Sequence, residues 1–390
     1  MFCKLRQKYR AWSDTINFIS IDQTEKPIVF FSENRSYRNY LEPVIRCLTV
    51  NLNRMVKYVT SDFEDPWLQS PLSNMAAFYV GTGLSRAKFF ESLDCGLFVS
   101  TTPDLDNFHI KRSGNRVHYI YLHHSIVSTH MIYRDGAFDH FDSILCVGPH
   151  HEKEVRQWEQ LKGLPQKRIF QHGYGPLDLL IEQKNEIKGP FLTENGAKRI
   201  LLAPSWGANG ILESGGGELI EAILGSDFHL TVRPHPQTRL LSPAILDELT
   251  SSFSDRPNFQ WEEDIRSHES FHAAHVMISD WSGAALEFAL GLERPVLFLD
   301  VPRKVNNPEY DKIEAIPLEV SIRSEIGKVV APNDPGAALQ ALNELCSNIE
   351  IYCDCARVAR SNWIYNVGKS GEVGARIISE LDDECRSSED

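Results

Sequence analysis

The chain has 390 residues, a formal net charge of −13, and 42% hydrophobic and 24% charged residues, which is typical of a soluble globular protein with room for two domains. The negative charge argues against wholesale wrapping of nucleic acid. No apolar run approaches the roughly 18–20 residues of a transmembrane helix, and the basic, aromatic start MFCKLRQKYRAW lacks the apolar region of a secretory signal. That start predicts either a solvated first helix or an amphipathic segment resting on an anionic membrane.

The first half of the chain alternates short apolar runs with helical spacing. Helices are predicted after SENRSYR, at Ala87–Leu93 and at His150–Leu161. Because helices separate the strands, we expect parallel pairing in an α/β sheet. The predicted strands are Ile28–Phe31, Val56–Thr60, Leu97–Thr101, Val117–Leu122, Ser143–Val147 and Arg168–Gln171.

The pattern breaks between about Leu179 and Lys198, where a polar stretch with Gly189, Pro190 and Gly196 predicts an interdomain linker. A second α/β set follows, with helices near residues 218–224, 243–251, 284–292, 336–348 and 371–381. Its predicted strands are Ile200–Ala203, His229–Arg233, Val276–Ser279 and Val296–Leu299. We therefore predict two doubly wound, Rossmann-like α/β domains that face each other across a cleft. The expected boundaries are 1–185, a linker at 186–198, a second domain at 199–360, and a C-terminal helix with a frayed acidic tail at 361–390.

The eight cysteines are scattered and form no CxxC pair, so we interpret them as reduced thiols of a cytosolic protein. The GxGxxG, GxxxxGK[ST], GxSxG and HExxH motifs are all absent.

Polar clusters follow the predicted strands, where ligands bind in open α/β sheets. They are His123-His124-Ser125, Gly173-Tyr174-Gly175-Pro176-Leu177-Asp178, Pro204-Ser205-Trp206, Arg233-Pro234-His235-Pro236 and Ser279-Asp280-Trp281-Ser282-Gly283. The last cluster leads into a helix whose start favours a phosphate, unless Asp280 or Ser282 merely caps an ordinary crossover helix.

The histidines of these clusters are candidates for proton chemistry. Two prolines restrict the backbone around His235, and Arg233 adds a fork-shaped phosphate partner. One of His123 and His124 is a candidate general base, although a buried structural histidine is equally compatible with the sequence. Tyr174 and Trp206 suit either stacking on a nucleobase or core packing.

Taken in order, these clusters resemble the CDP-glycerol glycerophosphotransferases of teichoic-acid and capsule synthesis. FDSILCVGPHHEKEV resembles the strand and helix start of that family, and GYGPLDLL resembles its G-Y-P-R-x-D element. LLAPSW resembles A-P-T-W, TVRPHP resembles K-x-H-P, and SDWSGAALEFALGLERPVLF is similar to S-D-Y-S-S-x-x-x-D with K-P-x-x-F. The resemblance covers about Val117–Asp300.

This chain also departs from the family pattern. LHHSIV replaces WHGT, and we prefer His124 for the family histidine, with His123 at the Trp position. Gly283 replaces the second Ser of the elbow, Glu287 replaces the Asp, and Arg294 replaces the Lys before the last Pro.

The resemblance implies a GT-B architecture whose C-terminal helix packs back on the first domain. It implies a CDP-activated alcohol such as CDP-glycerol as donor, with no cofactor and no metal. The donor diphosphate would lie over Ser282 and the helix start, Arg233 and His235 would neutralise phosphate charge, and His124 would accept the proton of the acceptor hydroxyl. Glu287 would face the ribose or orient the elbow, and Asp280 would orient His235 or cap the helix. The remaining candidates are Ser279, Gly283, Pro204, Ser205 and Trp206 for the donor, and Gly173 and Tyr174 in the cleft.

The expected acceptor is a cell-envelope glycan or lipid-linked hydroxyl, with the protein in the cytoplasm and in peripheral contact with the inner membrane face. Two alternatives remain open: a glycosyltransferase that uses a nucleotide sugar, and a non-catalytic scaffold of an envelope-polymer complex. A sugar-nucleotide 2-epimerase is less favoured, because no acidic constellation for it is evident in the sequence.

Overall fold

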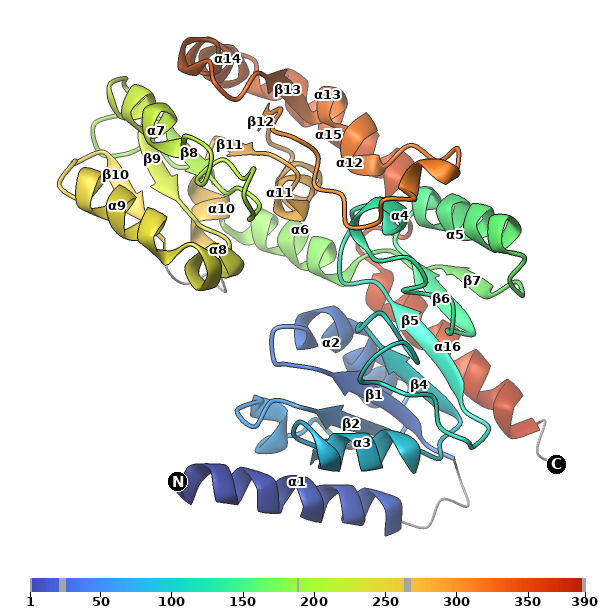
Figure 1. Cartoon of the computed structure of the whole chain (residues 1–390). Coiled ribbons are helices and arrows are strands. Elements are labelled where there is room, and N and C mark those ends of the chain that lie inside the picture. Colours follow the sequence, from blue (N-terminus) through green and yellow to red (C-terminus); the bar gives the residue numbers. More distant parts are fainter. Residues whose placement is uncertain (1, 21–25, 188, 263–267, 388–390) are drawn as a thin grey trace.

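The computed structural model describes residues 2–20, 26–187, 189–262 and 268–387. It has two lobes, each built on a parallel sheet with helices on both faces (Figure 1). Every strand pair in both sheets is parallel, as the alternation of strands and helices predicted.

The N-terminal sheet has the order β3-β2-β1-β4-β5-β6-β7. Its strands are β1 (Ile28–Ser32), β2 (Val56–Thr60), β3 (Met75–Tyr79), β4 (Leu97–Ser100), β5 (His118–Leu122), β6 (Ser143–Cys146) and β7 (Arg168–Gln171). The helices of this half are α1 (Phe2–Ser20), α2 (Arg38–Arg46), α3 (Leu84–Glu91), α4 (Thr129–Ile132), α5 (Pro149–Lys162) and α6 (Gly175–Ile187).

The C-terminal sheet has the order β10-β9-β8-β11-β12-β13. Its strands are β8 (Arg199–Leu202), β9 (His229–Val232), β10 (Phe259–Trp261), β11 (Val276–Ser279), β12 (Val296–Leu299) and β13 (Gly327–Val330). The helices are α7 (Gly216–Leu224), α8 (Pro236–Leu241), α9 (Pro243–Phe253), α10 (Glu269–Ala273), α11 (Gly283–Leu292), α12 (Leu318–Ser321), α13 (Arg323–Ile326), α14 (Pro335–Ser347), α15 (Ile349–Trp363) and α16 (Ser370–Ser387).

All ten predicted strands are present, and the three that the sequence did not predict are β3, β10 and β13, each at the edge of its sheet. Central strands such as β11 and β12 are buried at every residue, which gives the continuous apolar runs that a sequence reveals. Edge strands are partly exposed, as β10 is, and therefore carry a weaker pattern.

The α/β pattern was predicted to break from about Leu179 onward, and this starting point is wrong. Those residues belong to α6, which continues to Ile187 because Leu177 and Leu180 pack against α11 of the other lobe. Within the predicted linker, irregular backbone is confined to the described residues between α6 and β8.

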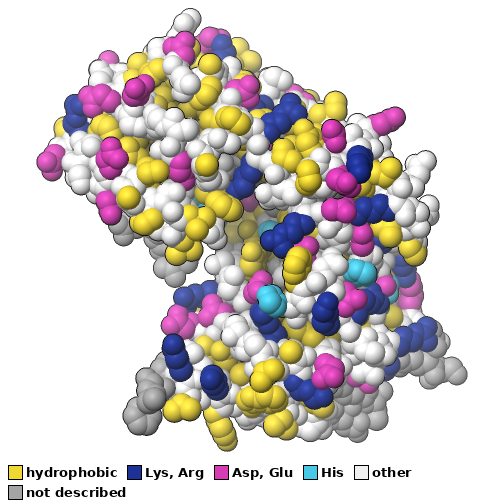
Figure 2. All heavy atoms as spheres, viewed as in Figure 1, with side chains coloured by type: hydrophobic (Ala, Val, Ile, Leu, Met, Phe, Trp, Pro, Cys, Tyr) yellow, Lys and Arg dark blue, Asp and Glu magenta, His cyan; other side chains and the backbone are white. Residues whose placement is uncertain are grey.

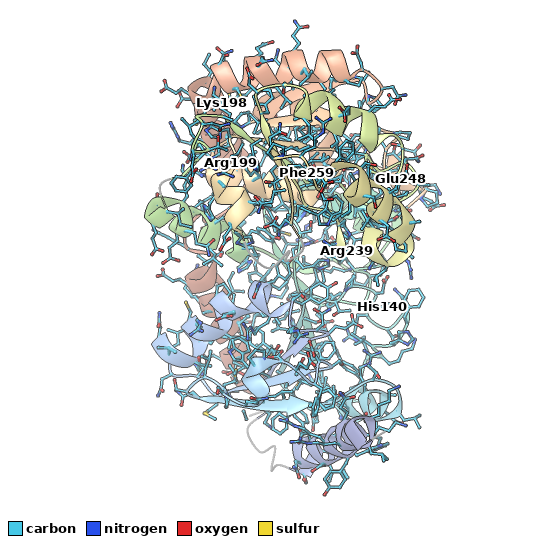
Figure 3. The ribbon with its side chains drawn as sticks, turned by 90° about the vertical axis from the view of Figure 1, so that its left-hand side faces the viewer. His140, Lys198, Arg199, Arg239, Glu248 and Phe259 are labelled. Atoms are coloured by element: carbon cyan, nitrogen blue, oxygen red, sulfur yellow. The ribbon has the colours of Figure 1, made fainter. Side chains whose placement is uncertain are left out.

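In each sheet the strand order reverses at one point, between β1 and β4 and between β8 and β11. Ligands of open α/β sheets bind beyond the carboxyl ends of strands near such a point. Lys198 and Arg199 lie where β8 begins, whereas Arg239 of α8 lies on the opposite side, beyond the carboxyl ends (Figure 3). The two reversal points therefore locate the expected site between the lobes.

The C-terminal helix α16 packs against α2 and β4 of the N-terminal lobe. Asp178 of α6 holds its start: the carboxylate accepts hydrogen bonds from the backbone N–H groups of Gly368 (2.6 Å) and Ser370 (2.9 Å) and from Ser370 Oγ (2.5 Å). In the family-like GYGPLDLL element, the aspartate thus serves to anchor the returning helix.

We expect Asp178→Ala to lower the free energy of unfolding by about 2–3 kcal/mol, because three donors lose their acceptor. Urea denaturation measures the change. Asp383→Ala is the matched control, since that carboxylate is exposed on α16 and pairs with Arg54, and we expect it to cost less than about 1 kcal/mol. Equal effects of the two substitutions would contradict the anchoring role.

Candidate active site

A cleft of about 530 Å³ lies between the two lobes, where the surface is hollowed in Figure 2. The N-terminal lobe contributes α2, the turn after β5 and the end of α4, and the C-terminal lobe contributes the turns after β8, β9, β11 and β12. The lining residues that matter below are Tyr40, His124, Ser125, Tyr133, Pro204, Ser205, Trp206, Arg233, His235, Ser282, Gly283, Glu287 and Lys304.

His124 lies on the N-terminal wall of this cleft. Its Nδ1 is 2.8 Å from the carbonyl oxygen of Thr101, which follows β4, and Tyr121 Oη lies 3.1 Å from the same nitrogen. Because a carbonyl only accepts, Nδ1 carries the proton and Nε2 holds a lone pair. Burial lowers the pKa of His124 to about 4, so the ring is neutral near pH 7.

His235 lies on the opposite wall, just after β9. Its Nδ1 accepts a hydrogen bond from the backbone N–H of Gln237 at 3.0 Å, because the Pro-His-Pro turn starts α8 at this point. In the neutral ring Nε2 therefore carries the proton. Burial, and next the charge of Lys304, lower the pKa of His235 to about 4.

The backbone thus fixes opposite tautomers for the two histidines that line the cleft. His124 offers an acceptor at Nε2, and His235 offers a donor at Nε2. One wall can take a proton while the other donates a hydrogen bond, which is the pairing that a group transfer between two oxygens needs.

His123 does not line the cleft, so its assignment as a candidate catalytic residue is corrected. It directly follows β5, and its ring lies 3.9 Å from that of His151 in α5. The side chain is 1% exposed. Of the two adjacent histidines, the structure brings His124 alone to the cleft.

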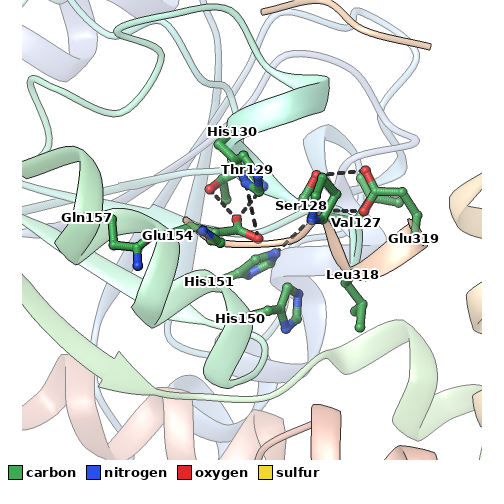
Figure 4. Close-up of polar contacts among 12 residues, drawn as sticks. Val127, Ser128, Thr129, His130, His150, His151, Glu154, Gln157, Leu318 and Glu319 are labelled. Atoms are coloured by element: carbon green, nitrogen blue, oxygen red, sulfur yellow. Dashed lines mark hydrogen bonds and ion pairs between the residues drawn. The ribbon is translucent and has the colours of Figure 1, made fainter. Parts of the chain in front are cut away.

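Buried polar side chains form hydrogen bonds with the turn that carries His124 and with the residues after it (Figure 4). His150 and His151 donate to the carbonyl oxygens of Ile126 (2.8 Å) and Val127 (2.9 Å). Next along the chain, Ser128 donates from its backbone N–H (2.8 Å) and its Oγ (2.7 Å) to the Glu319 carboxylate of α12.

Glu154 of α5 accepts from the backbone N–H (2.6 Å) and the Oγ1 (2.5 Å) of Thr129 in the same way. The two carboxylates, one from each half of the chain, fix the segment that follows His124. A catalytic group on a turn needs such support to keep its geometry.

The start of α11 forms part of the opposite wall. Ser282 is its N-cap, with Oγ accepting from the backbone N–H of Ala284 at 3.3 Å, and the first turn leaves N–H groups available to an anion. A Cβ at Gly283 would lie 3.2 Å from Ser125 Oγ, so a glycine lets the helix start approach the His124 turn closely. This contact gives a physical reason for the Gly at a position where the family motif has Ser.

Asp280 and Ser279 lie behind the cleft surface. Asp280 Oδ1 accepts from the backbone N–H groups of Ser205 and Trp281, both at 2.7 Å, and Ser279 Oγ donates to the Ala203 carbonyl oxygen at 2.7 Å. Asp280 therefore neither caps α11 nor contacts His235, and its expected role is corrected: it ties the turn after β8 to the elbow. Ser279 is likewise a buried tie between β8 and β11, and not a surface ligand.

Trp206 and Lys304 form a pair that sequence reasoning only half identified. Lys304 Nζ lies 3.7 Å from the centroid of the Trp206 ring and 3.3 Å from the Trp206 carbonyl oxygen, and the Trp206 ring is 6.1 Å from that of His235. Burial lowers the pKa of Lys304, and Asp280 and Glu213 offset part of that effect. The Arg303-Lys304 pair after a strand end was a signal that could have identified this cation.

Arg233 lines the cleft, and neighbouring side chains of the same lobe contact its guanidinium. Its Nη1 lies 3.5 Å from Glu262 Oε2 and 3.5 Å from Ser270 Oγ, and its guanidinium lies 4.7 Å from the centroid of the Phe271 ring. These contacts fix the guanidinium at the end of β9.

Tyr174 is buried, and its hydroxyl donates to Glu287 Oε1 of α11 at 2.7 Å. The expectation of a nucleobase stack is therefore replaced by a hydrogen bond between the lobes. Burial raises the pKa of Glu287 although the Tyr174 hydrogen bond and Arg233 lower it. Gly173 lies outside the cleft; its φ of +103° and a Cβ position 2.5 Å from the Tyr365 carbonyl oxygen explain why only glycine fits that turn.

The sequence missed two N-terminal lining residues, Tyr40 and Tyr133. The Tyr40 and Tyr133 rings lie 6.0 and 5.6 Å from that of His124, and Tyr133 Oη is 3.4 Å from His124 Nε2. Tyr40 belongs to α2, and Tyr133 directly follows α4. Arg294, at the family Lys position, lies away from the cleft and donates to the carbonyl oxygens of Phe271, His272 and Ala274.

Two doubly wound parallel sheets with a cleft between the carboxyl ends of their strands constitute the GT-B fold. Among solved structures, the chain is similar to the wall teichoic acid polymerase TagF soaked with CDPG, with a TM-score of 0.61, 16% identity, and coverage of 98% of this chain and 97% of that one. It is also similar to UDP-GlcNAc 2-epimerase from Neisseria meningitidis bound to UDP-GlcNAc, with a TM-score of 0.56, 16% identity, and coverage of 90% and 99%.

A glycosyltransferase from Rickettsia africae is similar as well, with a TM-score of 0.54, 11% identity, and coverage of 93% and 99%. No protein-family model and no curated protein matches the sequence. At these identities the likeness establishes the fold, and at that level the predicted resemblance to the teichoic-acid enzymes is confirmed.

Proposed function

We propose that the protein transfers a glycerol-phosphate-like (polyol phosphate) group from a CDP-activated donor to a hydroxyl of a cell-envelope glycan or lipid-linked acceptor. The observation that carries the proposal is the pair of opposite tautomers, with His124 as acceptor and His235 as donor on facing walls of one cleft.

In this reaction the acceptor oxygen forms a bond to the phosphorus that bears the polyol. The bond from that phosphorus to the bridging oxygen breaks, and CMP leaves with the electron pair. The acceptor proton goes to His124 Nε2, and the His235 Nε2–H hydrogen-bonds an oxygen of the donor diphosphate as negative charge moves onto CMP.

The charges of the two walls support this orientation. Arg233, Lys304 and the start of α11 are on the C-terminal wall, which suits the donor diphosphate. The described lining of the N-terminal wall is uncharged at neutral pH and aromatic, through Tyr40, Tyr133 and the neutral His124. That wall suits a neutral hydroxyl. The proposal places the protein in the cytoplasm, where nucleotide-activated donors are available, and it requires neither a cofactor nor a metal.

A screen of nucleotide-activated donors tests the proposal. We expect CDP and CMP to raise the melting temperature, and CDP-glycerol with a lipid-like acceptor to release CMP and add the mass of glycerol phosphate. His124→Ala and His235→Ala should lose this activity. The proposal fails if either variant keeps full transfer activity, or if no CDP-alcohol yields CMP.

A glycosyltransferase that uses a nucleotide sugar is the second candidate, because the Rickettsia africae glycosyltransferase has the same fold. Release of the nucleoside diphosphate together with a glycoside in the same screen would favour it. A scaffold without catalysis would bind none of the nucleotides, so the melting-temperature arm separates that class from both enzymes.

Lys304→Met should weaken CDP binding by about tenfold or more. The substitution removes a partly buried ammonium from the donor wall, and the phosphate then loses a charge-assisted hydrogen bond. Isothermal titration with CDP measures the change. Lys312→Met removes an exposed lysine that pairs with Glu309 and is the matched control. If both variants bind CDP equally well, Lys304 does not contact the donor.

A further inference from the structure

The hydroxyl of Ser125 lies on the N-terminal wall of the cleft, beside the start of α11. A Cβ at Gly283 would lie 3.2 Å from Ser125 Oγ and 3.6 Å from Val127 Cγ1. The first of these distances is shorter than an ordinary van der Waals contact, so the wall leaves little room for a side chain at position 283. The Ser125 hydroxyl therefore takes the place beside the helix start that such a side chain would fill.

A second contact brings the same face of α11 to this turn. Glu287 is four residues after Gly283, so the two lie on one face of the helix. Tyr174 Oη donates to Glu287 Oε1 at 2.7 Å and lies 3.3 Å from the carbonyl oxygen of His124. Tyr174 thus links the residue before Ser125 to α11 one turn beyond Gly283, and the approach of Ser125 to the helix start has support from two contacts.

The Ser125 hydroxyl has a proton that it can donate. Its Oγ accepts a long hydrogen bond from the backbone N–H of Val127 (3.4 Å), and no described residue accepts the proton of the hydroxyl. The side chain is half-buried and lines the cleft, next to the helix start whose N–H groups favour an anion. Ser125 is therefore placed to donate to an oxygen of the same anion.

The position beside His124 decides which phosphate this anion is. In the proposed reaction, the acceptor oxygen gives its proton to His124 and bonds to the phosphorus of the transferred group. The transferred phosphate must therefore reach the N-terminal wall, whereas the phosphate that leaves with CMP stays near Arg233 and Lys304 of the opposite wall. Ser125 is the next residue after His124, so its hydroxyl faces the transferred phosphate.

We propose that Ser125 is a further catalytic residue, whose Oγ donates a hydrogen bond to an oxygen of the transferred phosphate. This inference rests on the proposed function. The start of α11 and the Ser125 hydroxyl bind one phosphate from two lobes, which holds it beside His124 while charge moves onto CMP. Ser125 keeps its own proton throughout, because the proton of the acceptor goes to His124.

Binding of CDP and CMP to Ser125→Ala tests the assignment, because CDP has a phosphate in the place of the transferred group and CMP lacks it. We expect CDP to bind the variant about tenfold more weakly and CMP to bind it equally well, as measured by isothermal titration. Transfer from CDP-glycerol should also fall by about tenfold or more. Ser226→Ala is the matched control, because it removes a half-buried hydroxyl that donates to the Ile223 carbonyl oxygen (2.6 Å) and does not line the cleft.

An exchange of the two side chains provides a second test. Ser125→Gly with Gly283→Ser moves the hydroxyl to the opposite wall but leaves it in the same space. We expect this double variant to bind CDP within about threefold of wild type, and Ser125→Gly alone to show the tenfold loss.

Three outcomes would contradict the assignment. Equal CDP binding by wild type, Ser125→Ala and Ser125→Gly overturns it. An equal loss of CDP and CMP affinity in Ser125→Ala also overturns it, because the hydroxyl would then not distinguish the transferred phosphate. If the wild type binds neither nucleotide, the proposed function fails, and the Ser125 contact fails with it.

Discussion

His124→Ala should lower the rate of transfer by about 1000-fold, within the range that positioned general bases contribute. The imidazole is anchored through Nδ1 to Thr101 and keeps its Nε2 lone pair available at the cleft. Because burial lowers the pKa of His124 to about 4, nearly all of the protein has the basic form above pH 5. The negative phosphates of a bound donor would favour the protonated ring and raise the pKa of His124 toward neutral pH.

Steady-state release of CMP measures the loss, and titration with CDP supplies the control. CDP should bind His124→Ala about as tightly as the wild type, because the cations of the donor wall come from the other lobe. Tyr133→Phe retains the aromatic wall. It removes the long 3.4 Å contact to Nε2 and the hydrogen bond with Tyr121, so we expect less than about a fivefold effect on the rate. A His124→Ala enzyme within about threefold of wild type would exclude a base at this position.

The sequence predicted the fold well because the chemistry of the strands is local. Strands buried on both faces need apolar runs, and the polar residues that follow them mark the carboxyl ends of the sheets. That logic predicts His124, His235 and Ser282 from the sequence, and all three line the cleft. It failed for β3, β10 and β13, where an edge position relaxes the demand for an apolar run.

The roles of the polar residues were harder to predict than their positions. Asp280 and Ser279 lie in the expected cluster, yet their partners are backbone groups of the neighbouring strand end, which sequence order does not reveal. His123 and His124 are adjacent in the sequence, yet the ring of His123 packs against His151 while His124 lines the cleft. Lys304 comes close to Trp206 through a contact across 98 positions of sequence, so no local pattern could pair them.

Lowering the pH from 6.5 toward 4 should unfold the protein steeply. Burial lowers the pKa of His150 to about 3 and of His172 to about 4, and burial with neighbouring histidines holds the pKa of His123 well below its usual range. In the unfolded chain each titrates near 6.5. The unfolded state therefore binds more protons than the folded state in this window, and stability falls as pH falls. Above about pH 7.5 both states are neutral at these rings, and the dependence disappears.

Each such histidine contributes up to about 1.4 kcal/mol per pH unit to the slope. Glu287 and Glu319 act in the opposite sense, because burial raises their pKa and the folded state then holds the extra protons. A single substitution isolates one histidine from this sum. His150→Gln retains a donor for the Ile126 carbonyl oxygen and removes the titrating ring, so urea denaturation between pH 5 and 6 should lose about 1.4 kcal/mol per pH unit of slope. At pH 8 the substitution should change stability without changing the slope. If the slope between pH 5 and 6 is the same in both proteins, His150 takes up its proton in the folded state. The ring of His150 is then more accessible to water than its burial indicates.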